Sequence, residues 1–130
     1  MKTLKDIVTE KLVLNKSNAK QEYHYHPKDK DELKSLLKQL LKERGNDANL
    51  NDIDISQITD MSWLFAGSDP GNIDISGWDV SNVTDMNGMF YDCKNFNCDL
   101  SQWDVRNVKD IQNMFFNCYS LEKTPKWYEE

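Results

Sequence analysis

A 25-residue repeat runs without a gap through the second half of the chain. Three segments align at this spacing: LNDIDISQITDMSWLF (50–65), ISGWDVSNVTDMNGMF (75–90) and LSQWDVRNVKDIQNMF (100–115). A fixed period of roughly 20–50 residues indicates stacked supersecondary units, none of which can bury its apolar face without a neighbour. The repeat therefore predicts a solenoid, an architecture that usually presents a binding surface.

Each repeat is predicted to contain a short helix and a short strand. Apolar residues recur at spacings of three and four, which places them on one face of a two-turn helix. In the second and third repeats they are Val83, Met86, Met89, Phe90 and Cys93, and Val108, Ile111, Met114, Phe115 and Cys118. Alternation over residues 72–75 and 97–100 predicts strands of about four residues that pair in parallel. The expected fold is an α/β solenoid of about three strand–helix repeats.

The large side chains that return at the repeat period are assigned to the core. Trp78 and Trp103 are expected to fill the corner between strand and helix. Cys93 and Cys118 occupy equivalent positions one coil apart, and we expect buried free thiols because free Cys behaves as a small hydrophobic residue. The predicted core comprises Phe65, Trp78, Met89, Phe90, Cys93, Trp103, Met114, Phe115 and Cys118.

An amphipathic helix is predicted over residues 29–44. Asp29 and Glu32 form a capping signal at its start, and Gly45 supplies a stop. Its apolar stripe comprises Leu33, Leu36, Leu37, Leu40 and Leu41. Because so wide a stripe must be covered, the helix is expected to cap the first repeat.

This reading divides the chain into an N-terminal part, the repeats and a short tail. Alternation in residues 22–26 adds an edge strand to the predicted cap. The expected divisions are an N-terminal arm or short helix (1–21), an N-terminal cap (22–49), three solenoid repeats (50–123) and a C-terminal cap or tail (124–130).

Two of the repeats resemble a known bacterial family. WDVSNVTDMNGMFYDC and WDVRNVKDIQNMFFNC are similar to the repeat of the BspA-like leucine-rich repeat family, whose consensus runs close to W/F-D-T/V-S-N-V-T-D-M-x-x-M-F-x-x-C. The upstream segment YHYHPKDKDELKSLL is similar to one that often precedes the first repeat of that family. The resemblance implies a leucine-rich-repeat-like solenoid, commonly found on cell surfaces and associated with adhesion or partner binding.

Charge is distributed unevenly along the chain. Residues 1–50 hold 11 Lys/Arg against 8 Asp/Glu, whereas residues 51–123 hold 4 against 12. Nucleic-acid binding draws its affinity from cations on phosphate, so an acidic repeat surface argues against DNA or RNA as a partner. The same charge disfavours anionic membranes.

No apolar run approaches the roughly 18 residues of a membrane span, and MKTLKDIVTEKLVLNK lacks the apolar centre of a secretory signal. These features predict a protein without membrane insertion and a cytoplasmic location. The family resemblance adds the cell surface as the alternative.

Catalysis is not expected. No Gly-rich phosphate loop is present, and the two histidines, His24 and His26, fall in one three-residue stretch. A metal site at this histidine pair lacks an indicated third ligand, so a solvated edge is the favoured interpretation. No cofactor is expected.

The leading functional prediction is a protein-interaction module of the leucine-rich-repeat type, acting as a monomer or weak oligomer on a partner of unknown identity. Its contact surface is placed on the solvent face of the predicted strands. The proposed residues are Asn72, Asp74, Ser76, Asn97, Asp99 and Ser101. A plain hydrated surface is the alternative interpretation of these residues. The helical side around Asn87 and Gln112 is the next candidate surface.

A second functional prediction is a cation-binding repeat. Asp79 with Asp104, or Asp74 with Asp99, would stack about 5 Å apart and share a hard metal such as calcium. Stabilisation by calcium would distinguish this alternative from a protein-interaction module.

Overall fold

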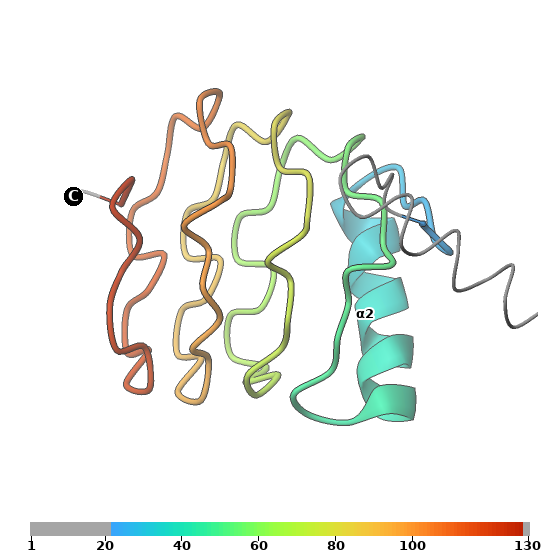
Figure 1. Ribbon diagram of the computed structural model, residues 1–130, viewed down its shortest axis with the longest axis horizontal. Coiled ribbons are helices and arrows are strands. Elements are labelled where there is room, and N and C mark those ends of the chain that lie inside the picture. The colour runs from blue at the N-terminus through green and yellow to red at the C-terminus, as the bar shows by residue number, and fades with distance from the viewer. Residues whose placement is uncertain (1–21, 129–130) are drawn as a thin grey trace, which may run out of the picture.

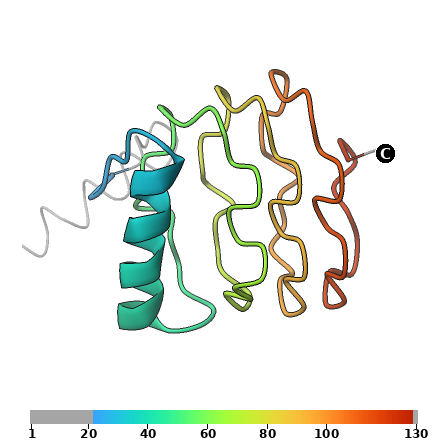
Figure 2. The ribbon, with the colours of Figure 1, turned by 180° about the vertical axis from the view of Figure 1, so that it is seen from behind.

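One helix stands at the end of a row of stacked coils in the computed structural model, which describes residues 22–128 (Figure 1). The helix, α2, spans Lys30–Arg44. We call residues 50–74 the first coil, 75–99 the second coil and 100–124 the third coil. The coils lie side by side in chain order, as the view from behind also shows (Figure 2).

Helix α2 has the limits and the apolar face that its sequence predicts. The Asp29 carboxylate accepts the Glu32 N–H at 2.9 Å, so one free donor of the first turn is satisfied. At the other end Gly45 has φ 77°, and its N–H donates to the Leu41 carbonyl at 2.9 Å. The fully buried side of the helix comprises Leu33, Leu37 and Leu40.

The prediction of an α/β solenoid with leucine-rich-repeat-like strand–helix repeats is wrong. Within residues 22–128 no helix follows α2 and no strand ladder forms. The bridges between backbones are isolated and parallel: Tyr25 with Ile53, Asn49 with Asp74, and Asp60 with Asp85 and then Asp110. Each coil is therefore built from turns alternating with short irregular segments.

Consecutive tight turns account for the apolar spacing that indicated a helix. In the first coil the Leu64 N–H donates to the Met61 carbonyl at 3.3 Å, and the Ser68 N–H donates to the Phe65 carbonyl at 3.1 Å. Such turns close between residues three apart, so apolar side chains at a spacing of three or four return to one side without forming a helix.

A left-handed residue recurs twice in each coil and prevents a helix from continuing. One position is occupied by Trp63, Gly88 and Asn113, with φ between 57° and 59°. The other position is occupied by Gly67, Asp92 and Asn117, with φ between 60° and 73°. Gly, Asn and Asp tolerate this conformation best, and they fill five of the six positions.

Across residues 61–67 and the equivalent residues of the second coil, the backbone hydrogen bonds that join neighbouring coils all run in one direction. Every second N–H of an earlier coil donates to a carbonyl of the next coil at 2.8–3.2 Å. An ordinary parallel strand instead presents N–H and C=O groups alternately at each edge. The eight donor–acceptor pairs are Met61–Asp85, Trp63–Asn87, Phe65–Met89, Gly67–Tyr91, Met86–Asp110, Gly88–Gln112, Phe90–Met114 and Asp92–Phe116.

Stacked aromatic rings form the centre of the core. Phe65, Phe90 and Phe115 lie parallel, with ring centroids 5.6 Å apart at both steps. The Trp78 and Trp103 indoles donate to the carbonyls of residues 28 positions earlier in the chain. All nine residues assigned to the core from sequence are buried: Phe65, Trp78, Met89, Phe90, Cys93, Trp103, Met114, Phe115 and Cys118.

The buried cysteines are free and take part in the stacking of the coils. The Cys93 Sγ–H donates to the Phe65 carbonyl at 3.2 Å, and the Cys118 Sγ–H donates to the Phe90 carbonyl at 3.0 Å. Burial raises the pKa of Cys93 to about 12 and that of Cys118 to about 11. Both groups are therefore thiols, not thiolates, at neutral pH.

The ends of the chain were also assigned from sequence. Residues 22–26, expected to form an edge strand, meet the first coil through one parallel bridge instead. The arm expected at 1–21 and the last residues of the expected tail, 129–130, lie outside the described residues. Within the described part, no helix has the length and apolar character needed to cross a membrane.

Candidate functional site

The six residues predicted as a contact face, here called the polar face, are exposed or half-buried and lie in turns, bends and irregular segments rather than on strands. Asp74 accepts the N–H and the hydroxyl of Ser76 at 3.1 and 2.7 Å, and Asp99 accepts the Ser101 N–H at 2.9 Å. The hydrogen bond from the Ser76 hydroxyl is the largest cause that lowers the pKa of Asp74, and the Ser101 N–H lowers that of Asp99. Both carboxylates are therefore anionic and hold their own turns.

The two predicted asparagines of this face connect neighbouring coils. The Asn72 side-chain oxygen accepts the Asn97 N–H at 3.0 Å, and the Asn97 side-chain oxygen accepts the Glu122 N–H at 3.1 Å. The Asp47 carboxylate begins the series by accepting the Asn72 N–H at 2.7 Å. The structure thus brings Asn72 and Asn97 together, and their acceptors stabilise the stack.

The aspartates of the cation alternative are engaged in the same way. Asp79 accepts the Ser81 N–H at 3.1 Å and the Ser81 hydroxyl at 2.6 Å. Asp104 accepts from the Arg106 side chain at 2.9 Å. In residues 22–128 no three His, Cys, Asp or Glu side chains gather where they could hold a metal ion. Calcium binding stays a prediction.

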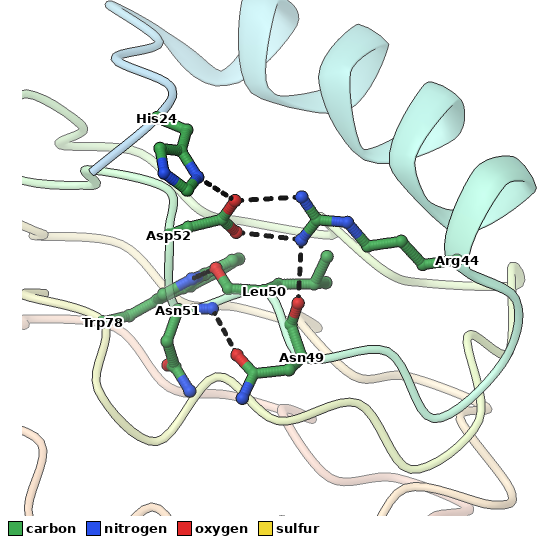
Figure 3. Close-up of polar contacts among 7 residues, drawn as sticks. All are labelled: His24, Arg44, Asn49, Leu50, Asn51, Asp52 and Trp78. Atoms are coloured by element: carbon green, nitrogen blue, oxygen red, sulfur yellow. Dashed lines mark hydrogen bonds and ion pairs between the residues drawn. The ribbon is translucent and has the colours of Figure 1, made fainter. Parts of the chain in front are cut away.

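A charged junction that sequence analysis did not identify fastens α2 to the first coil (Figure 3). The Arg44 guanidinium makes two bonds of 2.9 Å to the Asp52 carboxylate and a third, of 2.8 Å, to the Asn49 carbonyl. His24 Nδ1 lies 3.0 Å from the same carboxylate. The hydrogen bonds from Arg44 are the largest cause that holds the pKa of Asp52 well below its usual range. His26 lies 3.2 Å from Asp54.

A row of aromatic side chains, three of them exposed and one half-buried, crosses the coils at positions that sequence analysis also missed. We define this aromatic row as Trp63, Tyr91, Phe116 and Tyr119. Trp63 is 46% exposed, Phe116 49% and Tyr119 74%. Ring centroids lie 5.5 Å apart between Trp63 and Tyr91, and 4.9 Å apart between Tyr91 and Phe116. Trp63, Tyr91 and Phe116 therefore form a chain of ring contacts with one side chain from each coil, and Tyr119 is a second aromatic side chain of the third coil.

Glycine at position 88 makes room for the first member of the row. A Cβ atom at Gly88 would lie 2.3 Å from Trp63 Cε3, so the indole rests against the second coil only because this side chain is missing. A usable sequence signal was present: Tyr91 and Phe116 share one repeat position and directly follow the core residues Phe90 and Phe115. Two adjacent aromatic side chains in a turn cannot both enter the same core.

Together these features describe a repeat protein built from stacked coils of turns. Residues 32–129 match the family described as "Mycoplasma protein of unknown function, DUF285", and the chain belongs to this family. The match corrects the predicted membership of the BspA-like leucine-rich repeat family, because it gives no indication of leucine-rich repeats. No curated protein and no solved structure shows a significant match to the chain.

Proposed function

We propose that this chain is a non-catalytic protein-interaction module that contacts its partner through the aromatic row. The observation that supports the proposal most is the exposure of Trp63, Phe116 and Tyr119 on one small domain. Large apolar groups of this kind cost free energy in water and are enriched at protein interfaces, where Trp and Tyr often dominate the binding energy.

The aromatic row and the polar face differ in whether their side chains have a structural role inside the protein. The polar acceptors of Asp74 and Asn72 are used to hold turns and coils. The exposed faces of Trp63 and Phe116 have no comparable structural role, beyond the ring contacts along the row. We therefore place the contact on the aromatic row and keep the polar face as a weaker alternative.

Charge around the row favours a partner with basic residues. Residues 51–123 hold 12 Asp/Glu against 4 Lys/Arg. Asp85 and Asp110 begin the same segments from which Tyr91 and Phe116 project, and the Asp85 carboxylate stays at the surface of its turn. Lys and Arg side chains bind aromatic faces and are steered by carboxylates, whereas phosphate backbones are repelled.

Site-specific cross-linking tests the proposal. A photoreactive phenylalanine analogue at position 119, the most exposed position of the row, should trap a discrete protein from an extract of the native host. The same analogue at Lys38, on the exposed side of α2, is the matched control. Trp63→Ser combined with Phe116→Ser should abolish the adduct while the melting temperature changes little.

Dependence on the row is the decisive result. After the trapped protein has been purified, the double variant should bind it at least about tenfold more weakly than the parent, as expected for the loss of two aromatic anchors. Equal binding by parent and double variant, or the same adducts from positions 38 and 119, would overturn the proposal.

A further inference from the structure

Trp63 differs from the other three tryptophans in what its indole N–H contacts. The indoles of Trp78, Trp103 and Trp127 each donate to a carbonyl of the preceding coil at 2.9–3.1 Å. Among residues 22–128, Trp63 makes backbone hydrogen bonds and a ring contact with Tyr91, but its indole N–H has no acceptor. Trp63 therefore presents a free donor at the surface.

The backbone of Trp63 is held in a conformation that disfavours a bulky side chain. Its φ of 58° is left-handed, and the second and third coils place Gly88 and Asn113 at this position. A Cβ atom crowds the following carbonyl oxygen in that region, and residues kept there are often part of a functional site. Because the side chain is 46% exposed, packing inside the protein gives little reason for a tryptophan. Strain and exposure both indicate a binding role.

The Tyr91 hydroxyl adds a second free donor to the aromatic row. Within residues 22–128 the Tyr91 side chain contacts the rings of Trp63 and Phe116, and its hydroxyl has no hydrogen-bond partner. The centroids of the Trp63 and Tyr91 rings lie 5.5 Å apart. The row thus combines neighbouring apolar rings with two polar groups that can donate to a bound molecule.

The backbone of the row has no hydrogen-bonding group left for a partner. The N–H and C=O groups of Trp63, Tyr91 and Phe116 are all used within the stack. Strand addition needs such groups at an open edge, so it is excluded at the row. The six donor–acceptor pairs are Trp63–Asn87, Ala66–Trp63, Tyr91–Gly88, Gly67–Tyr91, Phe116–Asn113 and Asp92–Phe116.

A polyproline helix suits a surface that offers only side-chain donors. Its backbone has no internal hydrogen bonds, so its carbonyls are free to accept, whereas an α-helix uses its carbonyls internally. One turn advances about 9.3 Å, and two coil steps of about 4.8 Å cover nearly the same distance. Prolines one turn apart can therefore pack on Trp63 and Phe116, with a carbonyl between them near Tyr91.

The aspartates that begin the segments of the row favour basic residues beside the prolines. Asp60, Asp85 and Asp110 lie at one level of successive coils and are connected by parallel bridges. The Lys30 ammonium lies 3.0 Å from the Asp60 carboxylate. Within residues 22–128 neither Asp85 nor Asp110 has a cationic partner. Lys or Arg of a bound segment can supply that charge.

We infer that the aromatic row binds a proline-rich, basic segment of its partner in the polyproline conformation, with the Trp63 indole N–H and the Tyr91 hydroxyl donating to carbonyls of that segment. Recognition of this kind combines an aromatic surface with a peptide helix that is already formed before binding. The inference rests on the proposed function, because it names the partner segment for the same surface.

A blocked peptide of about ten prolines with an arginine at each end is a suitable probe. It is titrated into the full chain and followed by NMR of the indole N–H groups. The Trp63 signal should move to lower field and exchange with water about tenfold more slowly at about 90% occupancy. The signals of Trp78, Trp103 and Trp127 should stay in place, since these N–H groups already have acceptors.

Protein variants separate the donors from the rings. Trp63→Phe and Tyr91→Phe each keep an aromatic ring and remove one donor, so each should weaken peptide binding about two- to tenfold. Trp63→Asn introduces the residue type that the third coil has at this position, so it should melt close to the parent and bind at least about tenfold more weakly. Lys38→Gln, on the exposed side of α2, is the matched control and should bind as the parent does.

Control peptides separate the polyproline conformation from charge. A peptide of equal length with Gly and Ser in place of proline keeps both arginines but is a flexible coil, so it should bind at least about tenfold more weakly. The proline peptide with glutamine in place of arginine should also bind more weakly at low salt. This second difference should disappear at about 1 M salt, where charges are screened.

Three results would overturn the inference. The first is an unchanged Trp63 indole signal with excess peptide. The second is equal binding by the Gly-Ser peptide. The third is parent-like binding by the double variant Trp63→Phe, Tyr91→Phe. Row-dependent cross-linking without peptide binding would reject this inference and keep the proposed function, whereas cross-linking that is independent of the row would reject both.

Discussion

The two ends of the stack are closed by different physical means. At the α2 end, charged side chains match the polarity of the first coil: Arg44 binds Asp52, and Lys30 binds Asp60 and the Ser62 carbonyl. At the third coil, Trp127 and Tyr128 pack on Phe115 with ring centroids 6.4 and 4.9 Å away. The comparison teaches that a stack with one-way hydrogen bonds has two chemically unlike ends, each of which needs its own cover.

The largest expected effect comes from a matched pair of tryptophans. Trp78 is 3% exposed and donates to Leu50 inside the stack, whereas Trp127 is half-buried at its end. Trp78→Ala should lower the free energy of unfolding by about 3–5 kcal/mol, and Trp127→Ala by about 1–2 kcal/mol. Urea denaturation followed by circular dichroism measures both. Equal losses would show that the third-coil end is as firmly packed as the interior.

Glycine substitutions test the junction between coils apart from its ends. Gly88 has φ 59° and no room beside Trp63, whereas Gly67 has φ 73° with nothing within 4 Å of a new Cβ. Gly88→Ala should cost about 1–3 kcal/mol more than Gly67→Ala, which bears only backbone strain. Thermal unfolding compares the two. Adding Trp63→Ala should recover part of the loss at Gly88, and no recovery would contradict the assigned clash.

Packing of α2 on the first coil should lose stability in acid before packing at the third coil does. The pKa of Asp52 is depressed in the folded protein, so its contribution is fully present above the ordinary carboxyl value of about 4 and is lost as pH falls below it. Asp52→Asn should therefore have a melting temperature that changes less between pH 6 and pH 3 than that of the parent. The variant Asp110→Asn, at an exposed position of the third coil, is the control. Parallel pH curves for parent and Asp52→Asn would exclude the Arg44 junction as the acid-sensitive contact.

The smallest effect concerns thiol access along the stack. Cys98 is half-buried, Cys118 is 9% exposed and Cys93 is fully buried. At pH 8 a disulfide reagent should label Cys98 first, then Cys118 as the third coil opens, and Cys93 last. Mass spectrometry of timed samples gives the order. Simultaneous labelling of Cys93 and Cys118 would mean that the second and third coils open as one unit.

Helix α2 and the buried core could be predicted from sequence because each depends on a local pattern. The helix is predicted by local signals alone: the leucine spacing, the Asp29 cap and the Gly45 stop. Burial at the repeat period follows from stacking alone, whichever backbone conformation the repeat adopts. That is why Phe90 and Trp103 were placed in the core although the secondary structure around Phe90 was wrong.

The conformation of the coils could not be read from apolar spacing. Three- and four-residue intervals suit a helix and a succession of tight turns equally well. The deciding signal lay in Gly67, Asp92 and Asn117, residue types that tolerate a left-handed backbone at one repeat position. The same error moved the expected contact face onto strands that do not form.

The Arg44–Asp52 junction and the aromatic row depend on contacts between segments rather than on patterns within one. Arg44 and Asp52 lie on opposite sides of a turn, and neither the charge count nor the spacing indicates their pairing. Trp63 reaches the second coil because Gly88 lacks a side chain. Such relations appear only once the coils are stacked.

The one-way hydrogen bonds make every coil interchangeable with its neighbours. Across residues 61–67 and their equivalents each coil accepts on the side facing α2 and donates on the other, and at Thr84 and Lys109 the later coil donates back to the earlier one. Because these bonds repeat every 25 residues, an extra 25-residue unit inserted in frame between the second and third coils would find both of its surfaces matched. An insertion of any other length would shift the left-handed positions at Gly88 and Asn113 out of register. Gain or loss of whole units is therefore the route by which such a chain can change length while keeping its helical end and its aromatic end intact.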